Sequence, residues 1–151
     1  MSREMILLLL KGTGESLYMT LFSSAMAYLF GIPLGVLLYV TDSGGICRNR
    51  KINAIVGVVI NLLRSVPFLI LLVAILPFTR FVAGTSIGST ATVVPLIVAA
   101  TPFVARLVES SLKEVNSGVI EAARAMGSSP MQIVRKVLIP EAGPSLLVGS
   151  T

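Results

Sequence analysis

The feature that most constrains the fold is a run of 23 residues, 17–39, that contains no charged side chain. A helix rises about 1.5 Å per residue, so one of this length exceeds the ~30 Å hydrocarbon core of a bilayer. The composition agrees, because 54% of the chain is hydrophobic and only 13% is charged, whereas soluble domains carry about 25% charged residues. We therefore predict a transmembrane helix over 17–39.

Two further segments predict spans. Residues 55–77 contain Asn61 and Arg64 and then turn wholly apolar, and residues 87–105 combine a polar start with an apolar remainder. We expect an all-α, polytopic membrane protein whose three transmembrane helices form one domain over 1–151. Within the first span, small residues recur at every fourth position and predict a face for close helix packing; they are Ser23, Ala27, Gly31 and Gly35.

Arg64 lies about ten residues into the second predicted span. A charge at the bilayer centre costs about 2.5 kcal/mol or more. The side chain can snorkel toward the basic end of the span, or it can face a protein interior or a translocation path, where it would serve gating. The sequence leaves both interpretations open.

The lysines and arginines predict the orientation. They concentrate in the loop 40–54 and in the tail after residue 105, and Arg80 stands alone between the second and third spans. The positive-inside rule places the basic loop and the tail in the cytoplasm. The N-terminus is then outside.

Missing residue types exclude several functions. The chain has no histidine and one cysteine, Cys47, so zinc or haem sites and His-dependent nucleophilic catalysis lack their side chains. No G-x-x-x-x-G-K-[ST] phosphate loop is present. We expect a chain with no metal and no cofactor that is not itself an enzyme.

The tail predicts a helical hairpin over about 116–142. In the stretch EAARAMGSSPMQIVRKVLIPEA, Gly127 suits a left-handed helix end, and Ser129 begins a second helix with an S-x-x-Q capping box. Pro140 is expected to end that helix. The amphipathic second helix could rest on anionic lipid through its basic residues, and the alanines of the first could admit another protein closely. Docking to a partner is favoured over lipid, and DNA reading is disfavoured because that fold needs a third helix and a soluble core.

The hairpin resembles the EAA loop of ABC-importer permeases. That pattern is E-A-A, three residues, G, nine residues and I-x-L-P; here Glu121, Ala122 and Ala123 precede Gly127, and VLIP ends at Pro140. The stretches GESLYMTLFSSAMAYLFGIPLGVLLYVT, INLLRSVPFLILLVAILPFTRFVAGTSIG and VVPLIVAATPFVARLVESSLKEV resemble, within that family, the permeases of D,L-methionine importers.

The resemblance implies a multi-pass subunit of a bacterial inner membrane that pairs with a second permease copy. It also implies two cytosolic ABC ATPases that hydrolyse the ATP and a substrate-binding lipoprotein outside. The helix that carries Glu121, Ala122 and Ala123 would be the coupling helix in an ATPase groove, and Gly127 would make the turn behind it.

The resemblance to methionine permeases implies five spans, as in that subfamily, whereas three are expected here and the chain stops at GPSLLVGST, where the fourth should begin. The resemblance therefore implies a partial transmembrane domain. Two alternatives to methionine import stay open. One is a truncated, non-transporting membrane fragment, and the other is a permease for another amino acid or small polar solute. Substrate-contact residues are not assigned.

Overall fold

The computed structural model describes residues 2–149 and 151, and every regular element in that part of the chain is a helix, as the all-α prediction requires. α1 and α5 are each long and apolar enough to cross a membrane, and the bent pair α2–α3 gives a third candidate span. The helices are α1 (Arg3–Thr41), α2 (Arg50–Ser65), α3 (Phe68–Ala74), α4 (Leu76–Ala83), α5 (Ser89–Lys113), α6 (Ser117–Ala125), α7 (Pro130–Ile133), the π-helix η1 (Val134–Leu138) and α8 (Ile139–Gly149).

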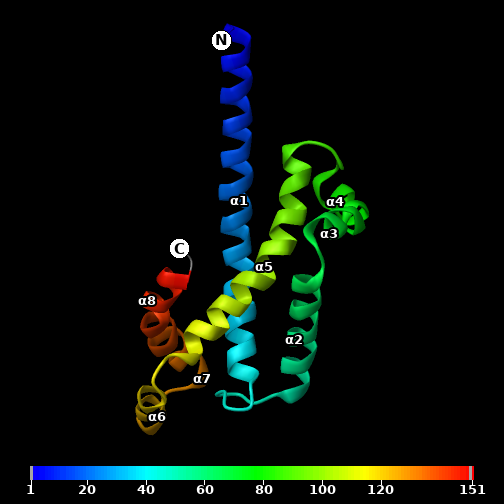
Figure 1. The fold of residues 1–151 in the computed structure, drawn as a ribbon. Coiled ribbons are helices and arrows are strands. Elements are labelled where there is room, and N and C mark those ends of the chain that lie inside the picture. Colours follow the sequence, from blue (N-terminus) through cyan, green and yellow to red (C-terminus); the bar gives the residue numbers. More distant parts are fainter. Residues whose placement is uncertain (1, 150) are drawn as a thin grey trace.

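The packing of α1 against α5 organises the fold (Figure 1). All four small residues of the predicted ridge are buried, so the prediction of a packing face is confirmed. A Cβ on Gly31 would lie 2.6 Å from Val104 Cβ, and one on Gly35 would lie 2.5 Å from the carbonyl oxygen of Ala105. The α5 backbone therefore approaches α1 at a distance that only glycine permits.

The second predicted span, 55–77, is broken in the structure. α2 ends at Ser65, and α3 leaves at an angle of 109° after a two-residue gap. Pro67 explains the break, because a residue that precedes proline is pushed out of the helical region, and Val66 is extended at φ −81° and ψ 125°. The remainder of the segment forms α3 and the start of α4, which contains Pro77.

α1 and α5 are both longer than the segments that predicted them. α1 begins at Arg3, and its N-terminal half is almost wholly exposed and projects beyond the other helices (Figure 1). α5 continues past residue 105 to Lys113, only a short turn before α6 begins. A single continuous helix, which contains Pro95 and Pro102, thus links the apolar bundle to the hairpin.

One buried cluster joins α1 and α5 to the hairpin. Its members come from both long helices and from every helical segment after α5, so the hairpin packs onto the bundle and does not hang free from it. The buried residues are Ala27, Val104, Val108, Leu112, Ala123, Ile133, Val134, Leu138 and Ala142.

The close approach at Gly35 gives a stability prediction. Gly35→Ala forces the new methyl group against Ala105 and Val108, so we expect the free energy of unfolding to fall by about 1–3 kcal/mol, as for overpacked cores. Thermal unfolding of the detergent-solubilised protein should show a lower midpoint. Gly14→Ala is the matched control in the same helix, because nothing lies within 4 Å of its Cβ position. Equal midpoints for both variants contradict the packing argument.

Candidate functional site

The turn of the hairpin is fixed by backbone hydrogen bonds. Gly127 has φ 79°, the left-handed conformation that glycine adopts at little cost. Its N–H donates to the carbonyl of Arg124 at 2.9 Å, and the N–H of Ser128 donates to that of Ala123 at 3.1 Å. This pair of bonds is the Schellman arrangement, which satisfies carbonyls at a helix end. The predicted left-handed cap at Gly127 is confirmed.

The second helix starts as its sequence predicts. Ser129 Oγ accepts from the backbone N–H of Gln132 at 3.4 Å, and Gln132 Oε1 accepts from the backbone N–H of Ser129 at 2.9 Å. Pro130 occupies the first turn, where its missing N–H leaves no bond unmade. The predicted capping box is present, so both sides of the turn are satisfied within the chain.

The expectation that Pro140 ends the second helix is wrong. The helical backbone passes through the π-helix η1 and continues as α8, in which Pro140 is the second residue. Proline is tolerated in the first turn of a helix because that N–H needs no partner there. The wider η1 turn, in which the Ile139 N–H bonds the carbonyl of Val134, separates that first turn from the helix before it.

The hairpin divides the E-A-A residues between two faces. Glu121 and Ala122 are exposed, and so are Gly127 and Pro140. Ala123 is only 3% exposed and belongs to the same buried cluster as Ile133 and Leu138. Ala123 therefore holds the two helices of the hairpin together, while Glu121 and Ala122 remain available at the surface.

Two exposed methionines flank the turn, and the sequence reasoning did not identify them as surface residues. Met126 is 79% exposed and Met131 is 67% exposed. In the sequence, Met126 continues the helical spacing of Val119, Ile120 and Ala123, which predicts that it lies on the apolar face of the first helix. It is instead the residue at which α6 ends, with ψ near 4°, so the spacing no longer applies. Large apolar side chains on both sides of a glycine turn were the available signal.

Glu121 also borders a pocket between the hairpin and the end of α1. The pocket has a volume of about 290 Å³, and its polar lining includes Asp42, Lys113 and Arg124 besides Glu121. The loop after α1 and the first helix of the hairpin thus lie at the same end of the molecule (Figure 1).

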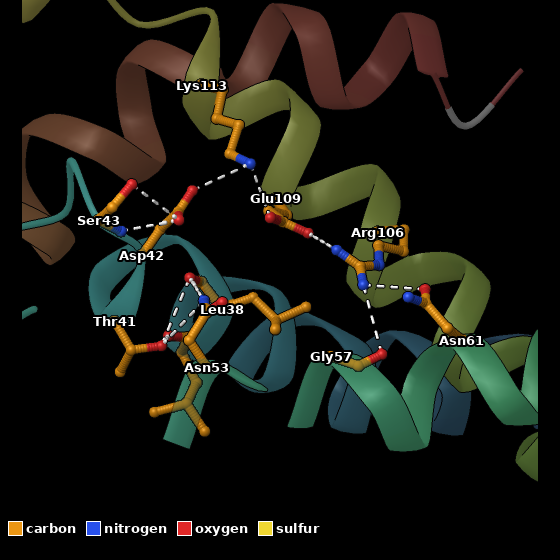
Figure 2. Close-up of polar contacts among 11 residues, drawn as sticks. Leu38, Thr41, Asp42, Ser43, Asn53, Gly57, Asn61, Arg106, Glu109 and Lys113 are labelled. Atoms are coloured by element: carbon orange, nitrogen blue, oxygen red, sulfur yellow. Dashed lines mark hydrogen bonds and ion pairs between the residues drawn. The ribbon is translucent and has the colours of Figure 1, made fainter. Parts of the chain in front are cut away.

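A chain of charged side chains runs beside the hairpin and ties α5 to two other helices (Figure 2). Glu109, whose side chain is 8% exposed, receives Arg106 Nη1 on Oε2 at 2.6 Å and Lys113 Nζ on Oε1 at 2.8 Å. Lys113 also pairs with Asp42 at 3.2 Å, at the end of α1. Arg106 Nη2 donates to Asn61 Oδ1 on α2 at 2.9 Å. We call this set, Asp42, Lys113, Glu109, Arg106 and Asn61, the ionic chain.

Asp42 and Lys113, two neighbouring members of the ionic chain, have shifted pKa values. The pKa of Asp42 is lowered, first by the hydrogen bond from the Ser43 backbone N–H and then by Lys113. The pKa of Lys113 is raised, mainly by its hydrogen bond to Glu109 and also by Asp42, in spite of partial burial. Both shifts favour the charged forms, so the pair stays ionised near neutral pH.

The sequence reasoning missed the ionic chain, although a signal was present. Arg106, Glu109 and Lys113 stand at i, i+3 and i+7, which puts them on one face of a helix. Arg106 and Lys113 entered only as charges that orient the chain. Arg64 is exposed in the last turn of α2 and makes no ion pair with any residue in the described part of the chain.

Comparison with known proteins shows which families and proteins this chain resembles. Residues 31–151 match the family of binding-protein-dependent transport system inner membrane components. The D-methionine transport system permease protein MetI of Escherichia coli K12 is 53% identical over 151 residues, which is all of this chain and 70% of that protein. A probable D-methionine transport system permease protein MetI of Vibrio cholerae is 52% identical over 140 residues, or 93% of this chain and 62% of that protein.

Solved structures agree with the sequence comparison. An inward-facing MetNI methionine ABC transporter contains a chain with a TM-score of 0.96 and 53% identity, and the match covers 99% of this chain and 69% of that one. A chain of an amino acid ABC transporter crystallised with histidines gives a TM-score of 0.59 at 27% identity, over 93% of this chain and 66% of that one. This chain therefore belongs to the family of binding-protein-dependent transport system inner membrane components, among the permease proteins of such systems.

Proposed function

We propose that the chain is the membrane-spanning permease subunit of an ATP-driven ABC importer for methionine. It is a multi-pass inner-membrane protein by its family and by its long apolar helices. The observation that carries the proposal is the 53% identity, over 99% of this chain, to a chain of the inward-facing MetNI methionine ABC transporter. ATP hydrolysis would fall to separate ATPase subunits, because this chain lacks a phosphate loop.

In this proposal the hairpin is the docking element for the ATPase. Glu121 and Ala122 lie on its exposed face, and Met126 and Met131 offer flexible apolar side chains that adapt to a partner surface. Ala123 transmits the contact inward, since it is packed in the cluster that also contains α5 residues. A displacement of α6 would therefore move α5. The same displacement would also reach α8 through Pro140, which lies in the first turn of that helix.

The wider assembly follows the relatives. Two copies of the permease would form the translocation path, two ATPase subunits would bind the hairpins, and an extracytoplasmic lipoprotein would deliver the substrate. The hairpin would lie in the cytoplasm and the N-terminus outside. The basic loop 40–54 supports this orientation, since it lies at the same end of the molecule as α6.

Two other functions compete with methionine import. A non-transporting membrane fragment would rest its hairpin on lipid through the exposed Arg135 and Lys136. A permease for another amino acid or small polar solute would keep the same hairpin and differ only in its path. The identity to methionine permeases favours methionine over both.

Docking through the hairpin is tested by co-purification with the ATPase subunits. Glu121→Lys reverses a charge on the exposed face, and Gly127→Pro imposes a negative φ where φ is 79° and removes the N–H that bonds Arg124. We expect both variants to lose most of the bound ATPase. Glu4→Lys, an exposed position at the start of α1 and at the opposite end of the molecule from α6 (Figure 1), makes the same charge change and should retain the complex. Retention by all three variants refutes the docking assignment.

Substrate identity is tested by uptake in a bacterial strain that lacks its own methionine importer. Expression of the chain with its ATPase and binding lipoprotein should restore accumulation of labelled methionine, and unlabelled histidine or leucine in excess should leave it unchanged. Accumulation of a different amino acid instead would support the second alternative. Normal membrane insertion with no accumulation of any solute would support the non-transporting fragment.

A path or gating role for Arg64 is tested by Arg64→Ala. We propose that the guanidinium faces the path at the bend between α2 and α3, so its removal should lower methionine uptake at least about tenfold while the amount in the membrane is unchanged. Arg64→Lys separates the two interpretations. Lysine snorkels as well as arginine, so a side chain that only snorkels tolerates this change in uptake. A role in the path needs the planar fork of donors, which lysine lacks, so uptake then falls. Uptake at wild-type level in the alanine variant supports snorkelling alone.

A further inference from the structure

Glu109 is the centre of the ionic chain. Each of its carboxylate oxygens receives a different cation, Arg106 on one and Lys113 on the other, and its side chain is 8% exposed. Through Arg106 it reaches Asn61 on α2, and through Lys113 it reaches Asp42 at the end of α1 (Figure 2). Through these two cations, one buried carboxylate thus connects α5 to α2 and to the end of α1.

Both cations that Glu109 binds belong to α5 itself, so the carboxylate holds the Arg106 and Lys113 side chains in fixed positions on that helix. From those positions the two cations make the bonds between helices, Arg106 to Asn61 on α2 and Lys113 to Asp42 at the end of α1. A movement of α5 along α2 would separate Arg106 from Asn61, and a movement along α1 would separate Lys113 from Asp42. The bonds therefore oppose sliding between the helices and leave motion of the three together without penalty.

The position of the ionic chain relates it to the hairpin. Lys113 is the last residue of α5, and α6 begins at Ser117. Lys113 and Asp42 also line the pocket that Glu121 borders. A force that acts on α6 thus reaches the ionic chain at the end of α5 as well as the apolar cluster in which Ala123 is packed.

We propose that Glu109 is a positioning residue for transport, which locks the ends of α1 and α5 to α2 so that displacement of the hairpin moves them as one unit. This inference rests on the proposed function, in which that displacement is driven by the ATPase. Without the carboxylate, α6 and α5 still move, but α2 lags behind.

The first test measures uptake per ATP hydrolysed in proteoliposomes that contain the transporter assembled from this chain and its ATPase, supplied with binding protein. Glu109→Gln keeps the shape of the side chain and removes its charge. We expect assembled complex and ATPase activity to persist while uptake per ATP falls at least about threefold. Glu15→Gln, at an exposed position on α1, is the matched control and should keep the wild-type ratio. The proposal is overturned if Glu109→Gln keeps the wild-type ratio of uptake to ATP hydrolysed. It is equally overturned if uptake and ATP hydrolysis fall together by the same factor.

Arg106→Gln extends this test to the partner residue. If the two residues act through one bond, the double variant with Glu109→Gln should be little worse in uptake per ATP than either single variant. Fully additive losses would overturn a shared role for Glu109 and Arg106.

The second test does not depend on transport. Spin labels on Val58 of α2 and Phe103 of α5, both more than half exposed, report the distance between these helices in the purified protein once Cys47 is replaced by serine. We expect one narrow distance distribution for the wild-type residue and a broader one for Glu109→Gln. Equal distributions overturn the locking role. Absence of uptake with the wild-type residue, by contrast, counts against the proposed function and leaves this measurement to decide on Glu109.

Discussion

The fold depends on the close contact between α1 and α5. Lipid tails are as apolar as leucine, so two helices in a membrane gain little from burying apolar side chains alone, and packing at short range must hold them together. Gly31 and Gly35 provide that range by letting α1 approach Val104, Ala105 and Val108 directly. α2 and the hairpin then pack mainly against α5 or the surface that it forms with α1.

Two kinds of interaction, apolar packing and ion pairing, hold the neighbouring helices at the end of α5. The buried apolar cluster fixes the hairpin to α5 through burial, which is not directional in the way a hydrogen bond is. The ionic chain is directional, because each of its bonds depends on the separation of two particular atoms. Apolar packing therefore determines what the hairpin is attached to, and the charged residues determine which helices are aligned with it.

Local patterns in the sequence predicted local structure well. The four-residue spacing of small side chains identified the packing face of α1, and the G-S-S-P-M-Q stretch predicted the turn and both caps, because these features depend on neighbours along the chain. The break at Pro67 was within reach of the same reasoning and was missed because hydrophobicity alone suggested one span. Other features were out of reach. Whether Ala122 or Ala123 faces outward, and that Arg106 meets Asn61 on α2, follow from how distant segments pack. Pro140 was misjudged because the π-turn before it changes what the helix can tolerate.

The turn at Gly127 is closed entirely by its own residues: a Schellman pair on one side and a capping box on the other. A partner that binds this tip meets a shape already formed. Association then loses little conformational entropy of the hairpin backbone, and the free energy of contact goes into affinity instead of into ordering a loop. The encounter is also not slowed by a folding step. A tip built in this way can follow the movement of a bound partner without having to refold.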